Sequence, residues 1–289
     1  MRSTPRRALA RRGMLDFAMI DCRHIPAMTP LDAHAYALHE AIGRAFVHSD
    51  PWIQVSDWLH LAAGLAAVKY DSRHDDGPIY CESIGDWNDR RDSVRSAYLL
   101  HATRLLYVCC AVEAAVRQLL GTNAARRHGG IVRAVAAALS TAVLDEPKGY
   151  EELVWHITVT GRSDAEFRSR IRAAASVSFR AAGAFLAFEI RNRLAHGTAR
   201  LPDADDDEHG ELARQVQLAD FSARVLLLTL QMLFIAHVDA ANVEMEDAYA
   251  TRSDGAELLS HRSWFAQLHL PRAPRGPPPD RERTGKQAV

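Results

Sequence analysis

Apolar residues recur at three- and four-residue intervals along most of the chain, which is the spacing of helices that bury one face. The strongest stripe predicts a core helix over residues 92–120, ending before Gly121. Its members are Val94, Tyr98, His101, Leu105, Val108, Val112, Ala115 and Leu119. The same spacing predicts helices over 131–143, 150–160 and 211–238, the last continuing weakly to Tyr249.

Helix-start signals predict three further helical segments. Thr29-Pro30 and Asp50-Pro51 each combine an N-cap residue with a proline suited to the first helical turn. Ser163 and Glu166 form a capping box that opens a helical stretch to about residue 196, with bends near 176–178 and 183. The polar stretch 71–89 contains Gly77-Pro78, and we expect it to be a loop.

Strand signals are weak, and the short run 155–160 is the only candidate. We therefore predict an all-α fold made of four segments. Residues 1–28 form a basic, disordered N-terminus, and residues 29–90 form a helical region without an assigned role. Residues 91–249 form a helical bundle, and residues 271–289 form a disordered tail rich in proline and arginine.

Composition indicates a globular protein that has no overall attraction to nucleic acid. The 289 residues are 48% hydrophobic and 25% charged, and the formal net charge is −1. Any RNA site must therefore be local. Fourteen histidines are present, yet none forms a recognisable zinc arrangement, and we expect no metal or cofactor.

The cysteines and the apolar runs indicate the cellular compartment of the protein. Cys22, Cys81, Cys109 and Cys110 show no Cys-x-x-Cys spacing, so we interpret them as reduced thiols of a cytosolic protein. The apolar run 225–238 is too short to span a bilayer. We therefore expect a cytoplasmic protein without a membrane segment.

The main candidate for chemistry is the run Arg191-Asn192-Arg193-Leu194-Ala195-His196-Gly197 at the end of an alanine-rich helical stretch. Asn192 and His196 are four residues apart, which places them on one helical face within hydrogen-bonding reach. Arginine offers a fork of donors to phosphate oxygens, and histidine exchanges protons near neutral pH. These three groups suffice for metal-free cleavage of an RNA phosphodiester.

Two explanations that involve no catalysis compete with that interpretation. About four or five Arg-x(4–6)-His matches are expected by chance from composition alone, and Arg95…His101 and Arg262…His269 are examples. His101 lies on the apolar stripe, and His269 lies beside the predicted tail. Basic residues at a helix C-terminus also complement the helix dipole, and Gly197 suits the left-handed position that ends a helix.

The Arg-Asn-x-x-Ala-His-Gly string resembles the R-x(4–6)-H signature of HEPN-domain proteins, many of which are ribonucleases of antiviral or toxin systems. HEPN domains are all-α bundles in which an earlier apolar helix packs on the motif helix and a long helix follows. The resemblance covers about residues 92–238, so the predicted bundle looks like a HEPN domain with an additional N-terminal helical region. Thr198 stands where toxins paired with nucleotidyltransferase antitoxins usually carry tyrosine, which argues against that subgroup.

The resemblance implies a metal-independent endoribonuclease that uses Arg191, Asn192 and His196 where two copies meet in a homodimer. It also implies RNA as substrate, a role in phage defence or stress response, and an antitoxin or sensor as a further partner. The alternative is a catalytically inactive HEPN-like module for dimerisation or for binding RNA or protein. A third interpretation treats the motif as a helix C-cap only.

Three features near the motif have open interpretations. Glu113, within the 92–120 stripe, either pairs with Arg191, forms an ordinary salt bridge or lies exposed, and we leave it out of the site. Seven arginines either follow a phosphate backbone or form a solvated face: Arg162, Arg168, Arg170, Arg172, Arg180, Arg193 and Arg200. The acidic run 203–208 is either a solvated loop or a segment that mimics RNA and blocks the site.

Overall fold

The structure is a computed structural model, which describes residues 25–45, 50–71, 82–140, 145–162, 164–174, 176–203, 210–237 and 265–271. These residues form an all-α fold, as the sequence predicts, and none of them lies in a strand. The helices are α1 (Leu31–Ala45), α2 (Asp50–Gly64), α3 (Glu82–Leu120), α4 (Ala124–His128), α5 (Ile131–Ser140), α6 (Tyr150–Gly161), α7 (Ala165–Ala174), α8 (Phe179–Ala195) and α9 (Glu211–His237).

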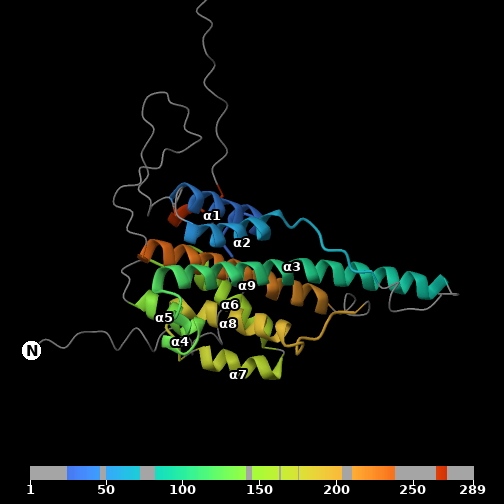
Figure 1. The fold of residues 1–289 in the computed structure, drawn as a ribbon. Coiled ribbons are helices and arrows are strands. Elements are labelled where there is room, and N and C mark those ends of the chain that lie inside the picture. The colour runs from blue at the N-terminus through green and yellow to red at the C-terminus, as the bar shows by residue number, and fades with distance from the viewer. Residues whose placement is uncertain are drawn as a thin grey trace, which may run out of the picture.

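The helices form three layers around the long pair α3 and α9, which run side by side (Figure 1). The hairpin of α1 and α2 covers one side of this pair. Helices α5, α6 and α8 cover the other side, with α7 outside α8 and α4 beside α5. Both α3 and α9 contact helices of the two outer layers, so they form the central layer, and Val225–Leu228 of α9 are fully buried.

One apolar core runs through all three layers. It includes Leu38 of α1, Leu59 of α2, Val112 of α3, Leu186 of α8 and Leu228 of α9, each 0% exposed. The core thus contains residues from both sides of the predicted boundary at residue 90. Of the predicted N-terminal segment, which ends at residue 28, residues 25–28 are described, and Ile25 and Met28 pack against this core.

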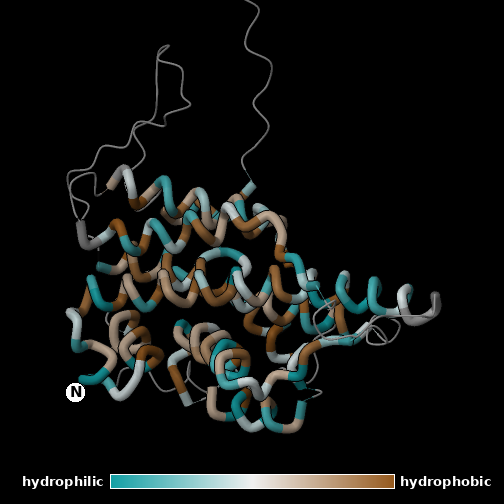
Figure 2. The backbone as a smooth tube through the Cα atoms, turned by 45° about the vertical axis from the view of Figure 1, so that its right-hand side comes forward, coloured by the Kyte–Doolittle hydropathy of each residue, from teal (hydrophilic) through white to brown (hydrophobic). Residues whose placement is uncertain are grey.

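Helix α3 begins about ten residues earlier than its apolar stripe predicts. The expected loop 71–89 is wrong over its last eight residues, because α3 starts at Glu82 and continues unbroken past residue 90. This end extends beyond the bundle and is largely hydrophilic (Figures 1 and 2). The residues of this end are mostly polar, so they form no apolar stripe, although Asn88 and Arg91 are buried. Pairs such as Asp86 and Arg90, four residues apart, favour a helix there.

Of the other predictions about local structure, some are confirmed and some are wrong. Residues 155–160 lie in helix α6, so the strand candidate is wrong, and α4 was not expected. The bend near 176–178 is confirmed as the break between α7 and α8, whereas α8 continues unbroken through Gly183. Ser163 lies outside the described residues; the neighbouring Asp164 caps α7 by accepting the Phe167 N–H at 2.9 Å.

The N-terminal end of α1 is tied to the C-terminal segment 265–271. The Thr29 N–H donates to the His269 carbonyl at 3.0 Å, and the Thr29 hydroxyl donates to the same carbonyl at 3.4 Å, so Thr29 ties the start of α1 to this segment. Phe265 stacks on Phe234 of α9 with ring centroids 5.2 Å apart. His269 is 1% exposed and therefore belongs to the core, unlike the position beside a tail that the sequence suggested. Residues 272–289 lie outside the described chain.

Two helices are long and apolar enough to cross a membrane by length and composition alone, α3 over Gly85–Leu120 and α9. Their apolar windows are 50% and 72% buried inside the protein. Core helices of soluble proteins pass the same test, so length and composition do not decide between the two settings.

Candidate functional site

Helix α8 carries the Arg–Asn–His motif on its last turn. Its preceding turns are buried, including Leu186, Phe188 and Ile190, and they fix the helix in the core. The helix ends in a Schellman motif, in which the Thr198 N–H donates to the Arg193 carbonyl at 2.9 Å. Gly197 has φ +67°, which confirms the predicted left-handed position.

Arg191 is held in place on three sides although it is only half-buried. Its guanidinium forms an ion pair with Glu113 of α3. It also donates to Asn192 Oδ1 at 3.1 Å and lies over the Phe188 ring, 5.2 Å from the centroid. The side chain is 26% exposed, so a phosphate can still reach it from solvent.

Glu113 is the residue that sequence reasoning left out and the structure brings to Arg191. It lies 78 positions away in sequence and also pairs with Arg117, one turn further along α3, at 3.8 Å. The available signal was a lone carboxylate inside the apolar run 105–116. Periodicity alone does not show which helix that carboxylate faces.

His196 is separate from this cluster. It is the C-cap of α8, with φ −91° and ψ 3°, and its side chain is exposed. Its backbone N–H donates to the Asn192 carbonyl at 2.9 Å. Within the described residues of the chain, the expected side-chain bond between Asn192 and His196 is not formed, and Asn192 Oδ1 accepts a bond from Arg191.

Cysteines lie beside Arg191 without joining its chemistry. Cys109 is buried and Cys110 is half-buried, and both are free. Burial raises the pKa of Cys109 to about 12, and the nearby charge of Arg191 offsets only a fraction of that effect. The Cys109 thiol therefore stays protonated at neutral pH, which makes it a packing residue. Cys22 and Cys81 lie outside the described residues.

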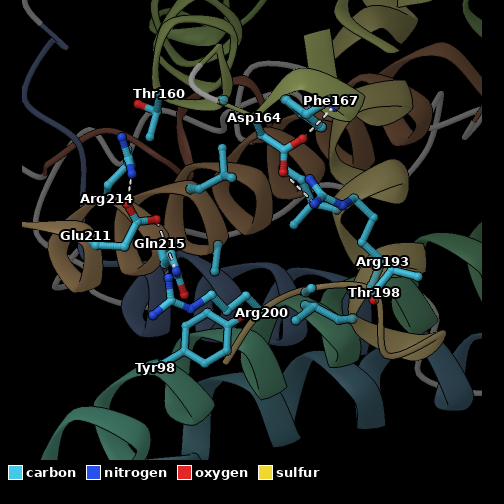
Figure 3. Close-up of a pocket in the computed structure, with 16 residues that line it drawn as sticks. Tyr98, Thr160, Asp164, Phe167, Arg193, Thr198, Arg200, Glu211, Arg214 and Gln215 are labelled. Atoms are coloured by element: carbon cyan, nitrogen blue, oxygen red, sulfur yellow. Dashed lines mark hydrogen bonds and ion pairs between the residues drawn. The ribbon is translucent and has the colours of Figure 1, made fainter. Parts of the chain in front are cut away.

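A cavity of about 360 Å³ opens on the other side of the last turn of α8 (Figure 3). Arg193 and Leu194 of that turn line it, as do Thr198 and Arg200 just after the motif. Helices α3, α6, α7 and α9 supply the remaining wall. Arg191, Asn192 and His196 do not line it, so the motif and the cavity are two sites on one helix end.

Charged side chains around the cavity are arranged in pairs. Arg193 bonds to Asp164 at 2.5 Å, and Arg214 pairs with Glu211. Burial opposes ionisation of Asp164, but bonds from the Phe167 N–H and Arg193 outweigh it and lower the pKa of the carboxyl. Asp164 is therefore a carboxylate at neutral pH.

The predicted arginine set divides into two kinds. Arg170 of α7 pairs with Glu189 of α8 at 3.0 Å, and Arg180 of α8 pairs with Glu146, in the loop before α6, at 2.8 Å, so these two join parts of the fold. Arg162, Arg168 and Arg172 are exposed. The seven arginines therefore do not form one continuous track. Of the acidic run 203–208, only Asp203 is described; it lies 4.0 Å from Arg95.

The described residues contain no group of three or more His, Cys, Asp or Glu side chains placed to hold a metal ion. The histidines of α1 and α2 have local roles instead: His39 Nδ1 bonds to the Ser56 hydroxyl at 2.7 Å and its ring lies 4.8 Å from that of His60.

No family model matches the chain, and neither the curated proteins nor the solved structures yield a significant match. The resemblance to HEPN domains therefore depends on the motif and on the order of the helices around it.

Proposed function

We propose that the chain is a metal-independent endoribonuclease of the HEPN type, in which Arg191, Asn192 and His196 carry the reaction. The observation behind this proposal is the pairing of half-exposed Arg191 with Glu113, one turn before an exposed histidine on the same helix end. A fixed guanidinium and an accessible imidazole at one helix end are the two kinds of group that phosphodiester cleavage needs.

In the proposed reaction, the neutral His196 imidazole takes the proton of a ribose 2′-OH. The 2′ oxygen forms a bond to the adjacent phosphorus as the bond from phosphorus to the 5′ oxygen breaks. A protonated His196, of the same or a second copy, gives its proton to that 5′ oxygen. The products are a 2′,3′-cyclic phosphate and a 5′-hydroxyl, and Arg191 stabilises the charge on the phosphate oxygens.

A second copy of the chain belongs to this proposal. In one copy, the described residues provide no side-chain partner for His196, and its exposed position leaves it open to a two-fold interface. We propose a cytoplasmic homodimer whose substrate is RNA. An antitoxin or sensor protein and a role in phage defence or stress response belong to the same proposal.

The test is cleavage of mixed cellular RNA in excess EDTA by the full chain, with analysis of the product ends. We expect 2′,3′-cyclic ends from the wild type, and a loss of at least about 100-fold for Arg191→Ala and His196→Ala, the scale of a missing acid–base group. Circular dichroism and melting curves verify that each variant is folded.

Two matched variants separate chemistry from structure. Arg180→Ala removes another ion-paired arginine of α8, and His128→Ala removes another exposed histidine. Both should cleave like the wild type. If they lose cleavage as the motif variants do, or if EDTA abolishes cleavage, the assignment of the reaction to Arg191 and His196 is wrong.

A catalytically inactive helical module is the second candidate. It is favoured because the Arg191 guanidinium is already bound to Glu113 and Asn192 within the protein. In that case intact RNA is recovered from wild type and variants alike, and His196→Ala leaves dimerisation or RNA binding unchanged.

A further inference from the structure

The corner of the molecule where α3 ends and α4 and α5 follow carries arginines without acids. The run 114–144 contains four arginines and lacks aspartate and glutamate throughout. Arg117 of α3 is 47% exposed, and Arg126 and Arg127 of α4 and Arg133 of α5 are exposed as well. These four arginines, called the α4 surface below, form a local excess of positive charge on a chain whose net charge is −1.

Most of this charge is not neutralised within the protein. Among the described residues, the three arginines of α4 and α5 form no ion pair. Arg127 donates to the Leu120 carbonyl, which ties α4 to the end of α3 and leaves the guanidinium charged. Arg117 is the exception, because it pairs with Glu113. The α4 surface therefore presents three guanidinium charges to a negatively charged partner.

The α4 surface begins beside the Arg–Asn–His motif. Glu113 contacts both Arg191 and Arg117, the latter at 3.8 Å. Leu120, where Arg127 is bound, lies about 10 Å further along α3 than Glu113. Figure 1 shows α4 and α5 together at this end of α3, and α5 packs on the motif helix α8. Since stacked nucleotides rise about 3.4 Å each, a strand at Arg191 reaches the α4 surface within a few nucleotides.

The residues between these arginines favour a nucleic acid over a lipid surface. Exposed neighbours are polar, including Gln118, Thr122 and Asn123. In the part of the chain that the structure describes, the large exposed hydrophobic residues lie elsewhere, on α1, α2 and α6 and at Leu201. Surfaces that bind a bilayer use such residues as anchors, whereas amide and hydroxyl groups bind phosphate and sugar oxygens.

We propose that the α4 surface binds the phosphate backbone of a single-stranded RNA that continues to Arg191. This inference rests on the proposed function, because it gives the RNA substrate its path to the motif. The run 114–144 contains no Phe, Trp or Tyr on which a base could stack. Binding therefore depends on charge and is independent of the RNA sequence.

Fluorescence anisotropy of a labelled single-stranded RNA decamer, titrated with the full chain between about 50 and 200 mM salt, tests the surface. The chain carries His196→Ala, so that the RNA is not consumed. We expect Arg126→Gln combined with Arg133→Gln to weaken binding roughly tenfold at about 0.1 M salt. The slope of log Kd against log salt concentration should fall by about 0.7 for each arginine removed, the value for one phosphate contact on a single strand.

Three comparisons define the site. Arg168→Gln combined with Arg172→Gln is the matched control, because it removes the same charge from exposed arginines of α7 and should leave the affinity and the slope unchanged. Adding Arg191→Gln to the α4-surface pair should lower the slope once more, since the strand continues to that side chain. Sedimentation with phosphatidylserine vesicles tests the other class of anionic partner. Melting curves verify that each variant is folded.

A loss of affinity and of salt slope in the α4-surface pair alone supports the proposal. Absence of RNA binding, an equal loss in the α7 control, an unchanged slope on adding Arg191→Gln, or binding to vesicles in place of RNA would overturn it. Failure of the proposed function gives a different result: the wild type leaves RNA intact, yet the α4-surface pair still loses RNA binding. Cleavage by the wild type with unchanged RNA binding of that pair rejects this inference and keeps the nuclease.

Discussion

Arg191 and Glu113, 78 positions apart, meet in an ion pair that links the motif helix to the middle of the bundle. Each side chain keeps about a quarter of its surface exposed, 26% and 29%. Half-exposed pairs add little to stability, about 1 kcal/mol or less. The pair therefore matters more for the orientation of the Arg191 guanidinium than for the stability of the fold.

Glu113→Gln is expected to lower RNA cleavage about tenfold, the effect of one lost bond to a charged group. The melting temperature should change by only a few degrees. Cleavage rate and melting curves measure the two effects, and Glu166→Gln, an exposed acid of α7, serves as control. A large loss of stability with unchanged cleavage per folded molecule would assign the pair to structure alone.

His34, Gln231 and His269 form a second residue-scale cluster, buried between α1, α9 and the segment 265–271. His34 Nε2 and Gln231 Oε1 are 2.8 Å apart, and Gln231 Nε2 is 3.3 Å from His269 Nδ1. Burial lowers the pKa of His34 to about 3, with a smaller contribution from His269. Burial likewise lowers the pKa of His269 to about 4.

Stability should therefore fall as the pH drops from about 6.5 towards 4. In that window the unfolded chain binds protons at both histidines, whose usual pKa is near 6.5, while the folded chain does not, so acid favours unfolding. Asp164 and Asp220 have pKa values lowered from 3.8, so they add to the loss of stability mostly at the acid end of this window and below it. Urea midpoints at pH 7.5, 6 and 5 measure the effect. His34→Gln should flatten the trend and His128→Gln should not; equal midpoints in the wild type would contradict the prediction.

Among the elements, α8 lies close to both α6 and α9 at Gly183. A Cβ at this position would lie 2.5 Å from Val225 Cγ2 and 2.9 Å from the Tyr150 hydroxyl oxygen. The Gly183 N–H also donates to that hydroxyl at 3.2 Å. The glycine predicted as a bend is therefore a contact point that lets three helices meet.

Gly183→Ala should destabilise the protein by about 1–3 kcal/mol, because the core has no room for the added methyl group. Gly43→Ala in α1 is the matched control: its Cβ would meet nothing within 4 Å. The control should be neutral or stabilising by up to about 1 kcal/mol, since alanine favours a helix. Urea unfolding compares the two, and an equal effect of both substitutions would contradict the packing argument.

Helix ends were predicted best where the signal is local. Gly121 and Gly197 both have positive φ and follow α3 and α8, as expected. The start of α3 was missed because its first turns project from the bundle and carry no apolar stripe. The run 155–160 looked like a strand because four of its six residues are β-branched, but burial of Ile157 and Thr158 in α6 outweighs that preference.

For the whole molecule, the segment 265–271 closes the core from the far end of the chain. Phe265 packs on Phe234, and its carbonyl accepts a bond from Gln231. The Thr29 N–H donates to the His269 carbonyl, so the segment also fixes the start of α1. The first and last described segments thus share one core.

Truncation before Phe265 should lower the free energy of unfolding by roughly 3–5 kcal/mol, the scale of losing one large buried aromatic side chain. A chain ending at Pro271 retains these contacts and is the control. Urea unfolding of both truncations measures the difference. Equal stability of the two would show that the contacts of Phe265 and His269 add nothing to the core.

The sequence by itself determined the all-α class, most helix boundaries and the position of the motif on a helix end, because periodicity, capping and the left-handed Gly197 depend on neighbours a few residues away. Only the tertiary structure decided that Arg191 meets Glu113, that Asn192 turns to Arg191 instead of His196, and that five helices enclose a cavity beside α8. These contacts join residues far apart in the chain, and their partners depend on how the helices pack, which no local pattern specifies.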